Sequence, residues 1–166
     1  MRALAVVSFL LWAAIAFSQT APPLKKGEGL TALTQIENAF RRIHDMPARP
    51  APRFDDGEED EVLEREAIVR EFDRIYRNFK DRFVQTPRPL TVYEEIVRQR
   101  NDSELAATIL NLGRQGFVSP VGPIAVGPED EISIRQYAKA LSFFFTRLAH
   151  YLNVPDPEFT PNIKDR

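Results

Sequence analysis

The sequence predicts an all-α protein: about five helices in a small bundle, with a Gly/Pro-rich loop or short hairpin at residues 117–131. Two observations predict this fold class. Apolar residues recur at three- and four-residue steps over most of the chain, and prolines are concentrated between those periodic segments. The chain has 166 residues, 43% apolar and 28% charged, which is typical of one globular domain.

Charge and cysteine content exclude several classes of function. The chain carries 22 Lys plus Arg against 24 Asp plus Glu, a net charge of -2. This balance disfavours a nucleic acid as a partner, because binding to its phosphates needs an excess of cations. It has no cysteine, which excludes disulfides, a thiolate metal site and a cysteine nucleophile. We therefore expect no cofactor and no metal.

The first residues have the pattern of an export signal. Met1-Arg2 is positively charged, Ala3 to Phe17 is an uncharged stretch of 15 residues, and small residues precede a cleavage site after Ser18. The alternative is an uncleaved anchor, but 15 residues fall short of the roughly 20 that cross a bilayer. We predict a signal peptide at 1–18, no integral membrane span in the mature chain, and a secreted or periplasmic location in a bacterial cell envelope.

The mature chain is predicted to begin with a flexible leader at 19–30, which is rich in Pro and Gly, followed by a first helix at 31–46. In that helix the inward stripe is predicted to consist of Leu33, Ile36, Phe40 and Ile43. The residues placed on the other side are Glu37, Arg41 and Arg42.

Residues 47–61 are predicted to be a Pro-rich and acidic linker. Its acidic run, Asp55 to Glu61, lacks the alternating ligand pattern of a calcium loop. We interpret it as carboxylates at the N-terminus of the next helix, where the helix dipole favours them.

A helical domain is predicted for residues 62–153, ahead of an extended tail at 154–166. Its periodic segments cover 62–83, 91–100, 103–115 and 133–152. Gly116 is expected to close the third of these helices. The last one begins with the capping box Ser133-Ile134-Arg135-Gln136, and Phe143 lies off its apolar stripe. Phe143 therefore either packs against the tail or marks a contact surface.

No set of residues in the chain matches a known catalytic motif. His44 and His150 stand at the ends of two different predicted helices and are interpreted as helix C-terminal cations. We expect a non-catalytic protein. The alternative of an exported enzyme with an unrecognised site requires a cleft lined by Glu94, Arg98, Arg114 or His150.

Several residues from 103 to 152 follow a known order: Leu112, Gly116-Phe117, a Gly/Pro-rich loop, Pro128, and Ile132-Ser133 before the last helix. This segment resembles one repeat of an S-layer homology domain. The resemblance implies attachment to a cell-wall polysaccharide, and the partner we expect is that polymer or an envelope protein.

The match to the S-layer homology motif is partial at the start of the last helix. Ser133 and Gln136 replace the Thr and Glu of the motif and keep the capping box. Ile134 replaces its polymer-contacting arginine, and Arg135 stands one position later, about 100° around the helix. The candidate binding residues are Ser133, Arg135 and Phe143.

The same segment also resembles a winged helix-turn-helix. In that alternative 103–115 would be the recognition helix, and 117–126 would be the wing. Arg114 is the single basic residue of that helix, too few for contacts with phosphates.

Overall fold

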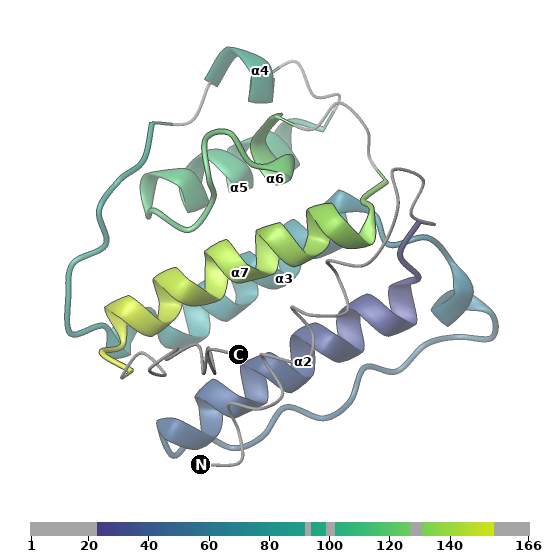
Figure 1. Ribbon diagram of the computed structural model, residues 1–166, viewed down its shortest axis with the longest axis horizontal. Coiled ribbons are helices and arrows are strands. Elements are labelled where there is room, and N and C mark those ends of the chain that lie inside the picture. Colours follow the sequence, from purple (N-terminus) through teal and green to yellow (C-terminus); the bar gives the residue numbers. More distant parts are fainter. Residues whose placement is uncertain (1–22, 92–93, 99–101, 127–130, 155–166) are drawn as a thin grey trace, which may run out of the picture.

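The computed structural model describes residues 23–91, 94–98, 102–126 and 131–154 (Figure 1). Within these ranges the chain is helical, with isolated β-bridges in place of strands, so the predicted all-α fold class is confirmed. The helices are α2 (Lys26–Ile43), α3 (Arg65–Phe79), α4 (Glu94–Arg98), α5 (Ser103–Arg114), α6 (Pro123–Val126) and α7 (Ile134–Tyr151), with 3-10 turns η1 (Glu58–Asp60) and η2 (Lys80–Arg82). The predicted signal peptide at 1–18 and tail residues 155–166 lie outside the described ranges.

Helix α3 is the centre of the bundle. Figure 1 shows α7 lying in front of α3, with α2 on one side and α5 and α6 on the other. The Phe72 ring of α3 stacks on Phe144 of α7 at 4.2 Å between centroids, and Phe145 of α7 stacks on Phe40 of α2 at 5.4 Å. The inward stripe of α3 is fully buried and consists of Ile68, Val69, Phe72, Ile75 and Phe79. Because each buried apolar side chain contributes about 1.5–3 kcal/mol, this stripe is a large part of the core.

The prediction of a flexible leader at 19–30 is wrong from Leu24 onward. Leu24 is 7% exposed and α2 begins at Lys26, five residues before the predicted start, and ends at Ile43. A Cβ on Gly29 would lie 2.4 Å from Leu63, so the glycine is needed for close packing of α2 against this leucine. The Pro and Gly content of 19–30, which predicted flexibility, has this structural reason at Gly29. Residues 19–22 lie outside the described ranges.

Three extended segments meet where α2, α3 and α7 begin. The amide of Leu63 donates to the Leu24 carbonyl at 2.7 Å, and the amide of Leu24 donates to the Ile132 carbonyl at 3.5 Å. Because residues 62–64 take part in this junction, α3 begins at Arg65 and not at 62. The predicted linker 47–61 is non-helical apart from the η1 turn.

Helix α5 occupies nearly the predicted range, and Gly116 ends it with φ of 78°. The amide of Phe117 donates to the Leu112 carbonyl at 2.8 Å and that of Gly116 to the Gly113 carbonyl at 2.9 Å, which is a Schellman motif. Residues 123–126 form the short helix α6. The predictions of a hairpin and of a wing are therefore wrong for the described part of 117–131. Residues 127–130 lie outside the described ranges.

The capping box of α7 is confirmed. The Gln136 amide donates to Ser133 Oγ at 3.3 Å, and the Ser133 amide donates to Gln136 Oε1 at 2.9 Å. Two backbone donors at the helix N-terminus are thereby satisfied within four residues.

The Ser133→Ala variant is expected to lose about 1 kcal/mol of unfolding free energy, because the side-chain acceptor at the N-cap disappears. Urea unfolding followed by circular dichroism measures this loss. Ser142→Ala, an exposed change inside the same helix, is the matched control and should be neutral or slightly stabilising. Equal losses in the two variants would contradict the role of the cap.

Candidate functional site

The outward face of α7 is the surface on which the predicted binding residues can be judged. Its exposed side chains recur at three- and four-residue steps opposite the core stripe, and they are Arg135, Lys139, Ser142, Thr146 and His150. Helix α7 contains no Asp or Glu. We call these five residues, together with Phe143 and Arg147 at their edge, the α7 outer face.

The three predicted binding residues do not form one cluster. The hydroxyl of Ser133 serves the helix cap. Arg135 is exposed in the first turn of α7, and Phe143 is half-buried two turns later, about 12 Å along the helix axis. The structure therefore places Arg135 and Phe143 on the α7 outer face and gives Ser133 a structural contact at its end.

Phe143 is covered by a cation of its own helix. The guanidinium of Arg147, one turn later, lies 5.3 Å from the centroid of the Phe143 ring, which is the geometry of a cation–π contact. The sequence analysis offered two roles for Phe143, packing against the tail or a contact surface. The first of these cannot be judged for tail residues 155–166, which lie outside the described ranges. The Arg147 contact shows that one side of the ring is already occupied.

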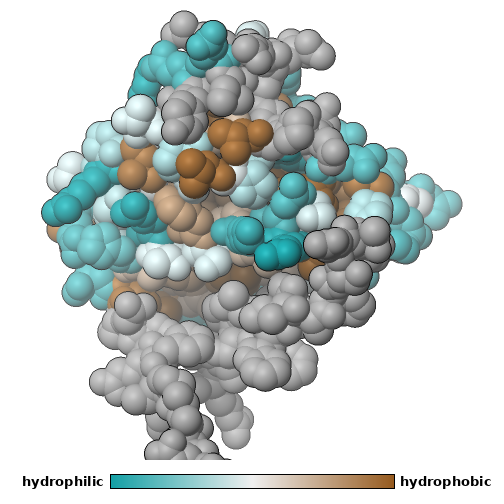
Figure 2. Space-filling model, turned by 45° about the horizontal axis from the view of Figure 1, so that its top comes forward, coloured by the Kyte–Doolittle hydropathy of each residue, from teal (hydrophilic) through white to brown (hydrophobic). Residues whose placement is uncertain are grey.

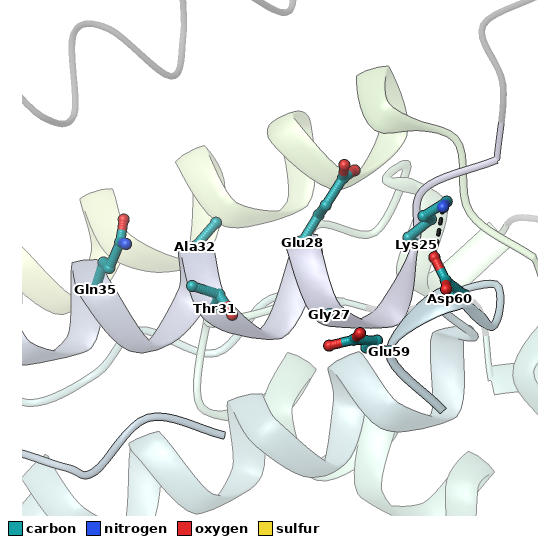
Figure 3. Close-up of a pocket in the computed structure, with 8 residues that line it drawn as sticks. All are labelled: Lys25, Gly27, Glu28, Thr31, Ala32, Gln35, Glu59 and Asp60. Carbon is teal, nitrogen blue, oxygen red and sulfur yellow. Dashed lines mark hydrogen bonds and ion pairs between the residues drawn. The ribbon is translucent and has the colours of Figure 1, made fainter. Parts of the chain in front are cut away.

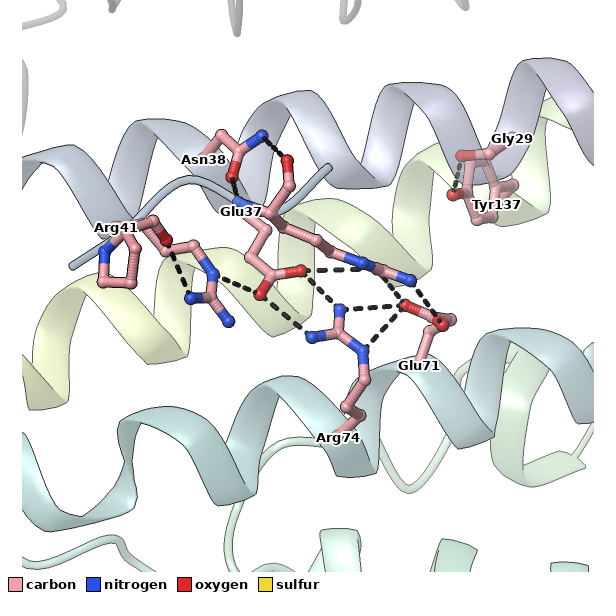
Figure 4. Close-up of polar contacts among 9 residues, drawn as sticks. Gly29, Glu37, Asn38, Arg41, Glu71, Arg74 and Tyr137 are labelled. Atoms are coloured by element: carbon pink, nitrogen blue, oxygen red, sulfur yellow. Dashed lines mark hydrogen bonds and ion pairs between the residues drawn. The ribbon is translucent and has the colours of Figure 1, made fainter. Parts of the chain in front are cut away.

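A partly buried cluster of charged side chains joins α2, α3 and the connector after α2 (Figure 4). Glu37 is 0% exposed and accepts hydrogen bonds from Arg41 Nε at 2.7 Å and from both terminal nitrogens of Arg74. Arg49 of the connector donates to Glu71 at 2.5 and 3.1 Å and lies 3.4 Å from Glu37. We call these five residues the Glu37 cluster.

The Glu37 cluster corrects the sequence analysis, which placed Glu37 and Arg41 on the outer side of their helix. The connector passes over that side of α2, where the Asn38 side chain bonds the backbone N–H and C=O of Arg49 at 2.7 and 2.9 Å. Burial alone would raise the pKa of Glu37, but the hydrogen bonds from Arg74 and Arg41 outweigh it and hold the pKa below its ordinary value. The carboxylate is thus ionised and fully paired, and it fastens helices together.

A second buried polar contact ties α7 to α2. Tyr137 Oη donates to the Gly29 carbonyl at 2.6 Å, also drawn in Figure 4, and burial raises the pKa of the phenol. This tyrosine is therefore a neutral hydrogen-bond donor that holds the start of α7 against α2.

The sequence analysis expected the acidic run at the N-terminus of the next helix. That prediction is wrong, because α3 begins only at Arg65, after the run has ended. Its carboxylates pair with two lysines at the start of α2: Lys25 with Asp60 at 2.5 Å, and Lys26 with Glu58 and, at 3.5 Å, with Glu61. Figure 3 shows a shallow open depression beside this turn, whose wall includes Glu28, Thr31 and Gln35 of α2. In the described ranges no group of three or more His, Asp or Glu side chains could hold a metal ion.

The prediction that His44 is a cation at the C-terminus of a helix is wrong about the charge. It follows the last residue of α2, and its ring meets that of Phe79 edge-on at 6.2 Å. Burial, with Arg82 nearby, lowers the pKa of His44, so the imidazole is neutral at neutral pH. His150 is exposed in the last turn of α7.

The residues suggested for an enzyme cleft are only partly described. Glu94 of α4 and Arg114 of α5 form an ion pair at 3.3 Å. Both side chains are about half exposed or more, 46% for Glu94 and 66% for Arg114. The side chain of Arg98 lies outside the described residues. This pair therefore forms a surface contact between two helices.

None of the described helices has the length and apolar character needed to cross a membrane. Exposed large apolar side chains in the described ranges are few and lie outside α7: Ile43, Val84 and Val121. Ile43 was predicted to lie on the inward stripe of the first helix, but it is 51% exposed in the last turn of α2, so the prediction is wrong for this residue. Figure 2 shows one face of the molecule, on which small groups of apolar side chains are bordered by hydrophilic ones.

Comparison with known proteins gives no match: no family model fits the chain, and neither a curated protein nor a solved structure is significantly similar to it. The resemblance of residues 103–152 to an S-layer homology repeat thus remains a prediction from the sequence.

Proposed function

We propose that this chain is a non-catalytic attachment module, exported to the bacterial cell envelope, that binds its partner through the α7 outer face. The observation that carries the proposal is that α7 bears outward-facing cations and no acidic residue. The cations Arg41, Arg49 and Arg74 are paired inside the bundle. Arg135 and Lys139 point outward, and no ion pair connects them to another described residue.

The sequence supports the same assignment. The segment that resembles an S-layer homology repeat includes α5, α6 and α7, so the α7 outer face belongs to the part of the chain for which the resemblance implies attachment. Export rests on the predicted signal peptide at 1–18. The partner is a cell-wall polysaccharide or an envelope protein.

The winged-helix alternative has less support from the side chains of α5. Leu105, Ile109 and Leu112 of that helix are buried, and its exposed positions include Glu104 and Asn111. A DNA-reading helix needs several outward cations, and α5 has Arg114 alone.

Cosedimentation with purified cell envelopes tests the proposal. Residues 19–166 should pellet with wall material that retains its polymers and surface proteins, whereas an unrelated helical protein of similar size and net charge should stay in solution. Complete recovery of the chain in the supernatant would reject an attachment role. Intact-mass analysis of native material should show that the chain begins after Ser18; an unprocessed chain that keeps Trp12 in a cytosolic fraction would reject export.

A further inference from the structure

The connector between α2 and α3 exposes its side chains in a regular pattern. Figure 1 shows it running along the outer edge of α2 toward the start of α3. From residue 46 to residue 53 every third side chain is partly buried: Met46, Arg49 and Pro52. The residues between them are exposed, and we call them the connector ridge: Pro47, Ala48, Pro50, Ala51 and Arg53. A period of three residues is that of a polyproline II helix, whereas a strand would alternate every two.

The sequence of the connector favours this conformation. Residues 46–55 form neither helix nor strand. Proline holds its own φ at about -65° and keeps the residue before it out of the α region. Because the connector has prolines at 47, 50 and 52, these three residues and the one before each of them are restricted to extended backbone.

The folded helices hold the connector from its inner side. The guanidinium of Arg49 reaches Glu71 at 2.5 and 3.1 Å, and the backbone N–H and C=O of Arg49 both bond the Asn38 side chain. Arg41 donates to the Pro47 carbonyl at 3.1 Å. The connector ridge is thereby fixed in place with its outer edge exposed to solvent. A partner that binds it need not order this segment, which lowers the entropic cost of association.

We propose that the connector ridge is a docking surface for a partner protein that has an aromatic-lined groove of the kind that receives polyproline II segments. Pro47 and Pro50 stand one turn apart on the same edge, about 9 Å along the axis, and this is the spacing of the P-x-x-P ligands of such grooves. Each of these two prolines is followed by an alanine, whose side chain is too small to cover it. This surface is separate from the α7 outer face, and the inference does not rest on the attachment function.

Arg53 adds a requirement on the charge of the groove. It continues the edge of Pro47 and Pro50 by one further turn, and its side chain is exposed. A guanidinium in this place forms its strongest contact with a carboxylate, through two parallel hydrogen bonds. The groove that fits the connector ridge therefore carries an acidic residue beyond its aromatic pockets.

Other kinds of partner fit the connector ridge less well. An added β-strand needs a row of free backbone groups, but the prolines have no N–H, and that of Arg49 is bonded to Asn38. A lipid surface needs large apolar side chains, whereas the apolar residues exposed here are proline and alanine. A nucleic acid needs several cations, and Arg53 is the one exposed cation of residues 46–54.

Titration of the isotope-labelled chain, residues 19–166, with a panel of isolated SH3 and WW domains tests the inference by nuclear magnetic resonance. Both types of domain bind polyproline II segments in aromatic-lined grooves. With at least one domain of the panel, the amide signals of Ala48, Ala51 and Arg53 should shift and reach saturation. The amide signal of Lys139, on the α7 outer face, should not move.

A double variant blocks the connector ridge without changing its prolines. Ala48→Glu combined with Ala51→Glu places a long charged side chain beside each proline and should weaken binding by about tenfold or more. The matched control adds the same charge at exposed positions of α5, through Ala107→Glu and Asn111→Glu. The control should bind within about threefold of the native chain. Because all four altered positions are exposed, both variants should melt as the native chain does.

Arg53→Glu is a second variant, which leaves both Pro-Ala steps unchanged. It should weaken binding by about threefold or more, because it would place a carboxylate opposite the acidic residue of the groove. Unchanged affinity in this variant would overturn the acidic groove, and it does so even if the double variant fails to fold.

Three results would overturn the docking surface itself. They are no binding by any domain of the panel, signal shifts that lie outside residues 46–54, and equal losses of affinity in the double variant and its α5 control. Cosedimentation with envelopes is judged separately: a native chain that binds a domain of the panel but does not pellet would reject the attachment function alone.

Discussion

The Glu37→Gln variant is expected to lose about 3–5 kcal/mol of unfolding free energy, the usual result of removing one partner from a buried ion pair. Glutamine keeps the size of the side chain but removes the charge that Arg41 and Arg74 share. Both guanidinium groups would then remain partly buried with less compensation. Urea unfolding at neutral pH measures the difference.

Glu66→Gln is the matched control for this variant. Glu66 and Arg70 form an ion pair at 2.6 Å on the surface of α3, with side chains that are 42% and 54% exposed. Because solvent screens such pairs, the control should change stability far less than Glu37→Gln. A loss in the control as large as that in the Glu37 variant would show that the buried cluster is not special.

Acid titration gives an independent check of the same cluster. The pKa of Glu37 in the folded chain is lower than its ordinary value of 4.5. The stability that follows from this shift is fully present above the unfolded pKa, and it is lost as the pH falls through the folded pKa. The native chain should therefore lose stability below about pH 4.5 more steeply than Glu37→Gln, which has no such proton to bind.

The features that the sequence predicted well depend on residues close to one another in the chain. The Ser133 and Gln136 capping box needs four residues, and the end of α5 at Gly116 needs a glycine that accepts a positive φ. The inward stripe of α7 follows from helical periodicity. Local rules were sufficient in each case.

The features that were missed depend on residues far apart. Glu37 is buried because Arg49 and Arg74, 12 and 37 positions away, reach it, and no helical pattern encodes that contact. Leu24 belongs to the core because residues 63 and 132 pair with it. In the candidate site, the resemblance directed attention to the motif positions, whereas Lys139 and Arg147 join the face only because α7 continues as one helix past them.

The second large effect is expected at Gly116, where Gly116→Ala should cost about 2–5 kcal/mol. With φ of 78° an L side chain is strained by about 1–2 kcal/mol. A Cβ there would also lie 2.4 Å from the Arg88 carbonyl oxygen and 3.0 Å from Tyr151 Oη, and relieving such overlap costs about 1–3 kcal/mol more.

Gly57→Ala separates the two causes, because Gly57 has φ of 84° and nothing within 4 Å of a built Cβ. It should cost about 1–2 kcal/mol from backbone strain alone, and the excess at Gly116 measures the collision. The segment that holds Arg88 cannot shift freely: the Arg88 amide donates to Tyr151 Oη at 3.0 Å, and the Val84 amide donates to the Tyr151 carbonyl at 2.8 Å. If the two variants were equally stable, the segment that holds Arg88 would be able to move away from the added Cβ at little cost. A larger loss at Gly116 would show that it is packed as firmly as the helices it joins.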